Sequence, residues 1–344
     1  MQTETQAKTE ALPQTGRFFA ELADRVLAGG VPTREEAHRI LGTPASEMED
    51  LLAAALRIRE KRWGRGVKIC MLQNARSGLC PEDCNYCSQS KVSTAEIDTY
   101  TLMQRGQLIA GAGRAVERGA RRYCMATSGR GPSDRDINEF CATTRAIKRE
   151  YPDLEICVSL GLMDDEKAVK LKEAGVGWVN HNLNTSERHH DNICSTHTYA
   201  DRVATVQAAK RAGMNTCCGG IIGMGEDDED VVQLGFALRE LGVDSLPVNF
   251  LHPIEGTPLG DQDHVDKDRA LRALCLMRFL NPEADIRAAG GSETTLGDDE
   301  YLALYPANSI FVAGYLTTPG RSADAARQMI EDRGFFVDGT EIEA

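Results

Sequence analysis

The sequence predicts an α/β fold, a (β/α)8 barrel of the TIM type preceded by a helical cap. After residue 65, short apolar runs alternate with amphipathic segments whose apolar residues recur at helical spacing. Eight such runs occur, and about 250 residues is the usual length of this barrel. Residues 17–63 carry only the helical spacing, which places a group of helices before the first strand.

The helical cap has recognisable starting points. Thr33 is followed three residues later by Glu36, and Ser46 by Glu49, which is the pattern of an N-terminal capping box. The sixteen residues before the cap are polar and are expected to be disordered. The predicted division is a lead-in at 1–16, the cap at 17–65, the barrel at 66–335 and a C-terminal tail at 336–344.

The barrel strands are predicted from apolar runs rich in β-branched residues. A doubly wound open sheet is the alternative arrangement of the same elements. The sequence has no G-x-G-x-x-G at the first strand-to-helix turn, which makes a dinucleotide-binding sheet the weaker interpretation. The predicted strands are 67–72, 121–127, 154–160, 176–182, 214–222, 243–251, 285–289 and 309–313.

The composition is that of a globular enzyme. The 344 residues are 42% hydrophobic and 26% charged, and the net charge of −13 with no basic run argues against nucleic-acid binding. No stretch has the length of a transmembrane helix, and the polar N-terminus lacks the apolar core of a signal peptide. Eleven cysteines in a chain of this kind predict reduced thiols and a cytoplasmic protein.

The most specific motif is the run CPEDCNYC, which carries Cys80, Cys84 and Cys87. Zinc sites use pairs of C-x2-C or a pair with distant histidines, so this C-x3-C-x2-C spacing is not a zinc pattern. Three thiolates can hold three irons of a cubane cluster and leave the fourth iron open. The loop follows the first predicted strand, and active sites of such barrels lie at the carboxyl ends of the strands.

A second group of residues is predicted inside the barrel. Cys124, Cys157 and Cys217 fall in three strands, and Arg287 falls in the seventh. Each cysteine alone is adequately explained by core packing. An arginine in a barrel strand requires a partner, however, and a second iron–sulfur site deeper in the barrel would use all four residues.

Polar residues also gather at the predicted strand ends. Asn180, Asn182 and Asn184 recur at every second position of strand four, which suggests a ligand-facing lining or a strand turning into a loop. Asn249 adds an amide near the end of strand six. The glycine-rich run 219–226 would let a flat ligand approach the backbone. Thr317 and Thr318 follow strand eight and offer hydroxyl groups or form a plain turn.

The CPEDCNYC spacing resembles the signature of the radical S-adenosylmethionine superfamily, with Tyr86 in the aromatic position beside the adenine. Over residues 30–335 the chain more closely resembles the biotin synthase family. The runs that carry this resemblance are SGLCPEDCNYCSQS, LEICVSLG, NHNLNTS, CCGGIIGMGE, PVNFLHPIEGTPL, DIRAAGG and ANSIFVAGYLTTPG.

The resemblance implies a homodimeric sulfurtransferase that inserts sulfur into dethiobiotin to give biotin, using S-adenosylmethionine and electrons from a flavodoxin or ferredoxin. No membrane or nucleic-acid partner is implied. The implied roles are a 4Fe-4S cluster on Cys80, Cys84 and Cys87, a 2Fe-2S cluster on Cys124, Cys157, Cys217 and Arg287, S-adenosylmethionine contacts from Tyr86, Asn184 and Ile221, and dethiobiotin contacts from Asn182, Asn249, Thr317 and Thr318.

The chain departs from many members of that family at three positions. Asn184 replaces an aspartate, which removes a charge-assisted acceptor and predicts weaker S-adenosylmethionine binding. Ser292 stands where a second arginine is usual, close to the predicted auxiliary cluster. Cys218 replaces a serine, and strand alternation points it away from the face of Cys217, so we expect it to pack rather than to bind iron.

Three other functions are compatible with parts of the sequence. A hydrogenase-cluster maturase would share the cysteine loop and the barrel. A non-catalytic zinc protein would share the loop alone. A barrel hydrolase with incidental cysteines would need a general base at the barrel mouth, for which His181, His189 and Glu226 are the candidates.

Overall fold

Parallel strands close into a barrel because the last barrel strand, β9, pairs with the first, β1. The computed structural model describes residues 14–338. The order around the barrel is β1-β2-β3-β4-β5-β7-β8-β9, with β6 continuing the β5 position beside β7. The strands are β1 (Gly66–Arg76), β2 (Arg122–Thr127), β3 (Glu155–Ser159), β4 (Trp178–Asn180), β5 (Asn215–Cys217), β6 (Gly220–Ile222), β7 (Ser245–Phe250), β8 (Asp285–Ala288) and β9 (Ser309–Val312).

The predicted fold class is confirmed, with one strand interrupted. The run expected as a single strand, 214–222, is two short strands separated by Cys218 and Gly219. A Cβ at Gly219 would lie 1.9 Å from the carbonyl oxygen of Pro247 on β7, so the backbones approach too closely for any other residue. The Gly219 N–H donates to Oδ1 of Asn182 at 3.0 Å instead of to a neighbouring strand.

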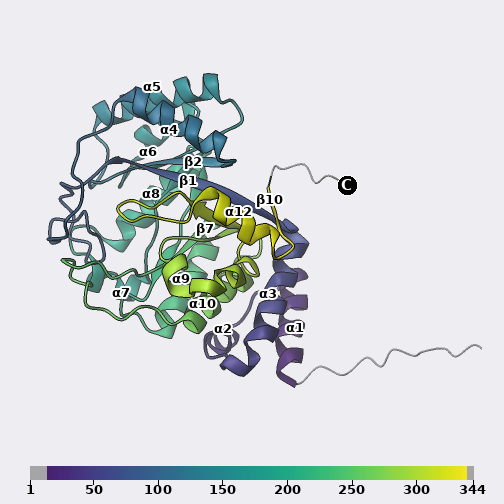
Figure 1. The fold of residues 1–344 in the computed structure, drawn as a ribbon. Coiled ribbons are helices and arrows are strands. Elements are labelled where there is room, and N and C mark those ends of the chain that lie inside the picture. The colour runs from purple at the N-terminus through teal and green to yellow at the C-terminus, as the bar shows by residue number, and fades with distance from the viewer. Residues whose placement is uncertain (1–13, 339–344) are drawn as a thin grey trace, which may run out of the picture.

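Helices surround the barrel on the outside (Figure 1). Several begin at a capping box, in which the N-cap side chain accepts from the backbone N–H three residues later and the side chain of that later residue accepts from the N-cap N–H. Ser133, Thr198 and Asp227 are the N-cap residues of α5, α8 and α9 in this arrangement. The helices are α4 (Arg105–Glu117), α5 (Asp134–Glu150), α6 (Asp165–Glu173), α7 (Glu187–Ile193), α8 (Tyr199–Arg211), α9 (Asp228–Leu241), α10 (Lys267–Leu280), α11 (Ser292–Leu296), the 3-10 segment η2 (Gly297–Leu304) and α12 (Ala323–Glu331).

The helical cap consists of α1 (Gln14–Leu27), α2 (Arg34–Leu41), the 3-10 turn η1 (Ala45–Glu47) and α3 (Met48–Trp63). The capping box predicted at Thr33 and Glu36 is present. The one predicted at Ser46 is wrong, because Ser46 lies inside η1 and α3 begins after it without a side-chain cap. Most of the lead-in predicted at 1–16 lies outside the described residues, and its last three residues belong to α1.

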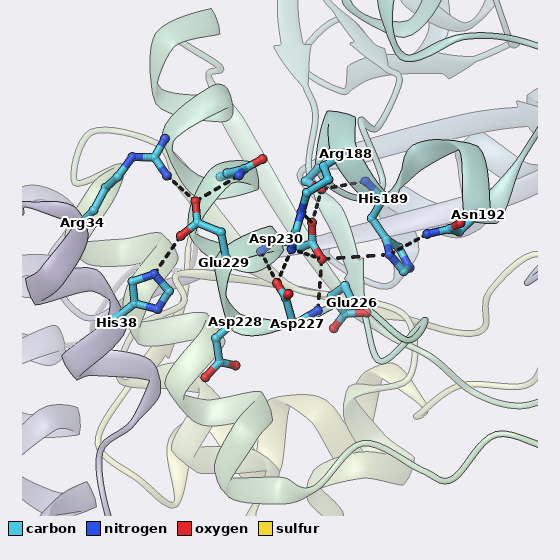
Figure 2. A network of polar contacts seen from close by, with 12 residues as sticks. Arg34, His38, Arg188, His189, Asn192, Glu226, Asp227, Asp228, Glu229 and Asp230 are labelled. Atoms are coloured by element: carbon cyan, nitrogen blue, oxygen red, sulfur yellow. Dashed lines mark hydrogen bonds and ion pairs between the residues drawn. The ribbon is translucent and has the colours of Figure 1, made fainter.

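Polar contacts attach the cap to the barrel. α3 packs along α10, and α2 packs on α9 and α10. On α2, Nη1 of Arg34 and Nε2 of His38 both contact the carboxylate of Glu229, at 2.6 and 2.8 Å (Figure 2). A two-residue strand that the sequence did not predict, β10 (Phe336–Val337), pairs with the start of β1. No helix within residues 14–338 is long and apolar enough to cross a membrane.

Strand alternation divides the apolar side chains into two sets. Ile69 and Met71 point outward and join the main core between the strands and the helices. Cys70, Leu72 and Phe311 point inward and form a small separate cluster inside the barrel. Every second side chain of each strand therefore points into the barrel interior, and these side chains form the walls of the site.

Candidate functional site

A cavity of about 260 Å³ opens at the carboxyl ends of the barrel strands. The loop after β1 and inward-facing residues of the other strands line it. Barrels of this type have their active sites at this end. The predicted residues that line it are Tyr86, Cys87, Asn180, Asn182, Ile221, Asn249, Thr317 and Thr318.

The three-cysteine loop is held in place by its backbone. The N–H of Cys87 donates to the carbonyl of Cys84 at 3.1 Å, and the N–H of Cys80 donates to that of Gln89 at 3.3 Å. The three cysteines are free thiols; Cys84 is buried, and the other two are half-buried. Burial raises the pKa of Cys87 to about 11. Three thiols in one short, fixed loop at the cavity rim are a suitable donor set for an iron–sulfur cluster.

The predicted interior residues converge. Cys124 and Cys157 are direct partners in the pairing of β2 with β3. The guanidinium of Arg287 lies 3.4 Å from Sγ of Cys217 and 2.9 Å from Oγ of Ser309. A hydrogen bond with Cys124 and complete burial raise the pKa of Cys157. The structure thus brings three thiols and one guanidinium together inside the barrel, as the sequence predicted.

Two further residues of this interior were missed from the sequence. Cys70 on β1 lies 3.7 Å from the Ser309 hydroxyl that also contacts Arg287. Arg122 on β2 is buried with its guanidinium stacked over Trp178. Both could have been found from alternation, since Arg122 is two residues before Cys124 and Cys70 is two residues before the inward-facing Leu72.

The charges of the interior fit an anionic group. Burial lowers the pKa of Arg287, but Cys70, Cys217 and Asp285 raise it above its usual value overall. Both terminal nitrogens of Arg122 and one oxygen of Asp285 have no hydrogen-bond partner within the described chain. Both buried guanidinium groups face Asp285, and Nε of Arg122 also donates to Glu155 at 2.9 Å. Within residues 14–338 the terminal nitrogens of Arg122 remain as unpaired buried donors, which the thiolates and sulfides of an iron–sulfur cluster would satisfy.

Two asparagines line the cavity wall and are fixed by backbone groups. Oδ1 of Asn182 accepts from the Gly219 N–H at 3.0 Å. Asn249 donates to the Gly220 carbonyl at 3.0 Å and accepts from the Gly290 N–H at 2.9 Å. Their amides are therefore held in one orientation toward the cavity.

Asn184 does not share this wall. β4 ends at Asn180, and Asn184 has a φ of 71°, which turns it toward Tyr86. Oriented by the surrounding donors, its amide oxygen accepts from the Tyr86 hydroxyl at 2.7 Å and from Arg202 at 3.2 and 3.3 Å. Ile221 packs with Tyr86 in one small apolar cluster at the same rim. The predicted S-adenosylmethionine contacts are therefore grouped together.

The two threonines lie beside the cysteine loop. Oγ1 of Thr317 is 2.9 Å from the hydroxyl of Ser88, the residue after the last loop cysteine. Thr318 accepts a hydrogen bond from the Tyr315 N–H through its carbonyl, and its side chain borders the cavity. Although they are far from Asn182 in the sequence, both threonines line the same cavity as that residue.

Cys218 and Ser292, two of the three positions at which the chain differs from many biotin synthases, lie outside the barrel interior. Cys218 is fully buried in the main core between strands and helices, as alternation predicted, and burial raises its pKa to about 12. The hydroxyl of Ser292 donates to the carboxylate of Glu300 at 3.2 Å. Neither side chain belongs to the inward-facing set.

The three general bases that a hydrolase would need are buried or engaged in other contacts. Burial lowers the pKa of His181 well below its usual value. The carboxylate of Glu226 accepts from the N–H groups of Gly223 and Met224 at 2.8 and 2.7 Å and closes the turn before α9. His189 contacts the Met224 carbonyl and faces Asp230 (Figure 2), and it is not among the residues that line the cavity.

Solved structures share the fold. A methylornithine synthase superposes with a TM-score of 0.81 at 21% identity, covering 92% of this chain and 97% of that one. The [FeFe]-hydrogenase maturase HydG from Carboxydothermus hydrogenoformans gives a TM-score of 0.77 at 16% identity, covering 94% of this chain and 79% of that one. At these identities the likeness concerns the fold alone.

The sequence comparisons identify the family. Residues 76–236 match the Radical SAM superfamily model, and residues 247–336 match the Biotin and Thiamin Synthesis associated domain. The chain is 47% identical to a biotin synthase of Magnetococcus marinus over 94% of its length and all of that protein. It is 48% identical to a biotin synthase of Anoxybacillus flavithermus, covering 92% of this chain and 96% of that one. The chain therefore belongs to the biotin synthase family.

Proposed function

We propose that this chain is a radical sulfurtransferase that inserts one sulfur atom into dethiobiotin and so closes the thiophane ring of biotin. The observation that carries the proposal is that two sets of three cysteines lie at two depths of one barrel. A cavity lies between the set in the loop and the set in the interior. Sequence identity of 47% to biotin synthases over nearly the whole chain supports the same conclusion.

The loop thiols would hold the outer group. Cys80, Cys84 and Cys87 would bind a 4Fe-4S cluster with one iron open to S-adenosylmethionine. When bound, the two clusters and S-adenosylmethionine supply the 5'-deoxyadenosyl radical and the sulfur atom. Asn184 would bind the ribose of S-adenosylmethionine, and Tyr86 and Ile221 would contact its adenine.

The interior residues would hold the second group. Cys124, Cys157, Cys217 and Arg287 would bind a 2Fe-2S cluster, the source of the inserted sulfur. Arg287 and Arg122 would balance the charge that the thiolates gain when iron binds, since both guanidinium groups are buried beside Asp285 and the terminal nitrogens of Arg122 have no hydrogen-bond partner within residues 14–338.

The cavity residues would orient dethiobiotin between the two depths. Asn182 and Asn249 would bind the ureido ring, because an amide both donates and accepts hydrogen bonds as a urea does. Thr317 and Thr318 would receive the carboxylate. A cavity bounded by apolar side chains such as Phe311 and Leu251 would keep water from the reacting carbons, and the fixed amides would select which hydrogen is removed.

The partners beyond the substrate remain part of this proposal. A homodimer and an electron donor of the flavodoxin or ferredoxin type follow from the biotin synthase family. All eleven cysteines are free thiols, which suits the reducing cytoplasm. The domain limits proposed from the sequence place the catalytic barrel at 66–335.

The test is a reaction of the full chain, purified and reconstituted with iron and sulfide without oxygen. S-adenosylmethionine, a reductant and dethiobiotin are added, and 5'-deoxyadenosine and biotin are measured by mass spectrometry. We expect both products. Deoxyadenosine without biotin would assign the chain another substrate, and neither product from an iron-replete sample would overturn the proposal.

Matched variants separate the two groups in the same assay. Cys80→Ser should abolish both products, whereas Cys217→Ser should still form deoxyadenosine and lose biotin. Cys275→Ser, which alters a buried cysteine on α10 outside both groups, should retain both products.

A further inference from the structure

The loop between α7 and α8 brings two metal-binding side chains against the three-cysteine loop. Sγ of Cys194 lies 3.7 Å from Sγ of Cys84 and 3.3 Å from Nδ1 of His197. The ligand atoms of these three residues lie within 4.8 Å of one another, and all three residues are buried. Neither Cys194 nor His197 has a part in the proposed reaction.

Two of the three separations match those around one tetrahedral ion, and the third is within 4.8 Å. Zinc binds thiolate sulfur at about 2.3 Å and histidine nitrogen at about 2.0–2.1 Å. In a regular tetrahedron these bond lengths place two sulfur ligands about 3.8 Å apart and a sulfur and a nitrogen about 3.6 Å apart. The observed separations of 3.7 and 3.3 Å need shifts of only a few tenths of an ångström.

Carboxylates fix this arrangement and add negative charge. Asp83 accepts hydrogen bonds from the backbone N–H and the hydroxyl of Ser195, at 2.9 and 2.5 Å, which ties the two loops together. Oδ1 of Asp83 also lies 3.1 Å from Sγ of Cys194. Glu82 contacts Nδ1 of His197 directly. One carboxylate, Asp83, therefore lies beside the cysteine, and the other, Glu82, lies beside the histidine. An ion bound at Nδ1 of His197 would displace any proton shared there with Glu82 into solvent, and either carboxylate could then serve as the fourth ligand.

We propose that the cluster-free chain binds one thiophilic divalent cation, Zn²⁺ or Fe²⁺, through Cys84, Cys194 and His197. The ion would compete with the 4Fe-4S cluster for Cys84, and only this competition rests on the proposed function. A bound ion would hold the cysteine loop against the loop before α8 until cluster assembly withdraws Cys84. Zinc at this site would delay that assembly.

The test uses Co²⁺ alone as the probe, added without oxygen to the full chain stripped of iron. Tetrahedral thiolate-bound Co²⁺ has intense charge-transfer and d–d absorption bands. We expect one equivalent to bind, and Cys194→Ser and His197→Gln each to weaken binding by about tenfold or more. Cys141→Ser, a buried thiol on α5 far from this loop pair, should leave binding unchanged.

Two further variants distinguish this site from the cluster cysteines. Cys80→Ser and Cys87→Ser should retain the Co²⁺ bands, because neither residue belongs to the proposed site. Loss of the bands in these two variants, with retention in Cys194→Ser, would place the ion on the cluster loop and overturn the proposal. Absence of stoichiometric binding in the unaltered chain would do the same. Circular dichroism establishes that each variant is folded.

The competition has its own measurement. One equivalent of Zn²⁺ added before iron and sulfide should slow formation of the 4Fe-4S absorption at least about fivefold in the unaltered chain, and have little effect in Cys194→Ser. Equal slowing in both proteins would mean that zinc acts elsewhere. The Co²⁺ experiment needs neither cluster nor substrate, so its failure leaves the proposed reaction intact, and failure to form biotin leaves the cation site intact.

Discussion

Sγ of Cys217 lies 3.4 Å from Nη1 of Arg287, although the two residues are 70 positions apart and β7 separates their strands. The contact exists because both side chains point into the barrel. Ser245 on the intervening β7 adds its hydroxyl, 3.3 Å from Nη2 of Arg287. The guanidinium is thus fixed across three strands, which makes it a positioned partner for any cluster that the interior thiols hold.

Replacing Arg287 should weaken the auxiliary cluster selectively. Arg287→Ala removes the guanidinium from the thiols, so we expect cluster affinity to fall about 10–100-fold. Arg287→Lys keeps the charge without the planar fork and should lose less. The measurement is iron and sulfide content after a chelator challenge. Arg105→Ala, at an exposed ion pair with Glu139, is the control. Equal retention in Arg287→Ala and the control would remove Arg287 from the cluster site.

Neighbouring cysteines provide a matched pair of variants. Cys217 faces the interior, and Cys218 packs in the outer core. Cys217→Ser should lose auxiliary iron with little change in the stability of the cluster-free chain. Cys218→Ser should keep its iron but lower the free energy of unfolding by about 1–2 kcal/mol, because it buries a hydroxyl group among apolar side chains. Iron analysis and denaturant unfolding separate the two results. Similar iron losses would make Cys218 a ligand.

Strand alternation explains how much of the site was predictable. In a closed barrel every inward-facing residue reaches a common interior, so strand assignment alone brought Cys124, Cys157, Cys217 and Arg287 together. The same rule would have added Cys70 and Arg122. The signal for both is present in the sequence, because each lies two residues before another inward-facing position of its strand.

Loop geometry explains what could not be predicted. Cys194 and His197 lie in a segment with no periodicity, and their position depends on Asp83, more than a hundred residues earlier in the chain. The break in strand 214–222 depends on the carbonyl of Pro247, and the turn at Asn184 depends on Tyr86 and Arg202. Each is set by a tertiary contact that local propensity does not encode.

The strand break at Gly219 should tolerate no side chain. A Cβ there would meet the Pro247 carbonyl oxygen at 1.9 Å, so Gly219→Ala must move β6 or β7. We expect a loss of about 3 kcal/mol in the free energy of unfolding. The control is Gly106→Ala on α4, where a Cβ meets nothing within 4 Å and should stabilise the helix by about 0.5–1 kcal/mol. Denaturant unfolding of the cluster-free chain measures both, and an unchanged midpoint in Gly219→Ala would contradict the assigned clash.

If Asn184 contacts the ribose as proposed, Asn184→Asp should bind S-adenosylmethionine more tightly. The amide oxygen already faces the guanidinium of Arg202 and the hydroxyl of Tyr86, so a carboxylate would be ionised there and remain in place. A charged acceptor strengthens a hydrogen bond from a ribose hydroxyl by about 1 kcal/mol, which corresponds to about fivefold in affinity. Calorimetric titration of the cluster-loaded chain measures the effect. Asn180→Asp, on the cavity wall and without a hydrogen bond to Tyr86 within residues 14–338, should bind no more tightly than the unaltered chain. Equal affinity in Asn184→Asp and the unaltered chain would mean that this amide does not contact the ribose.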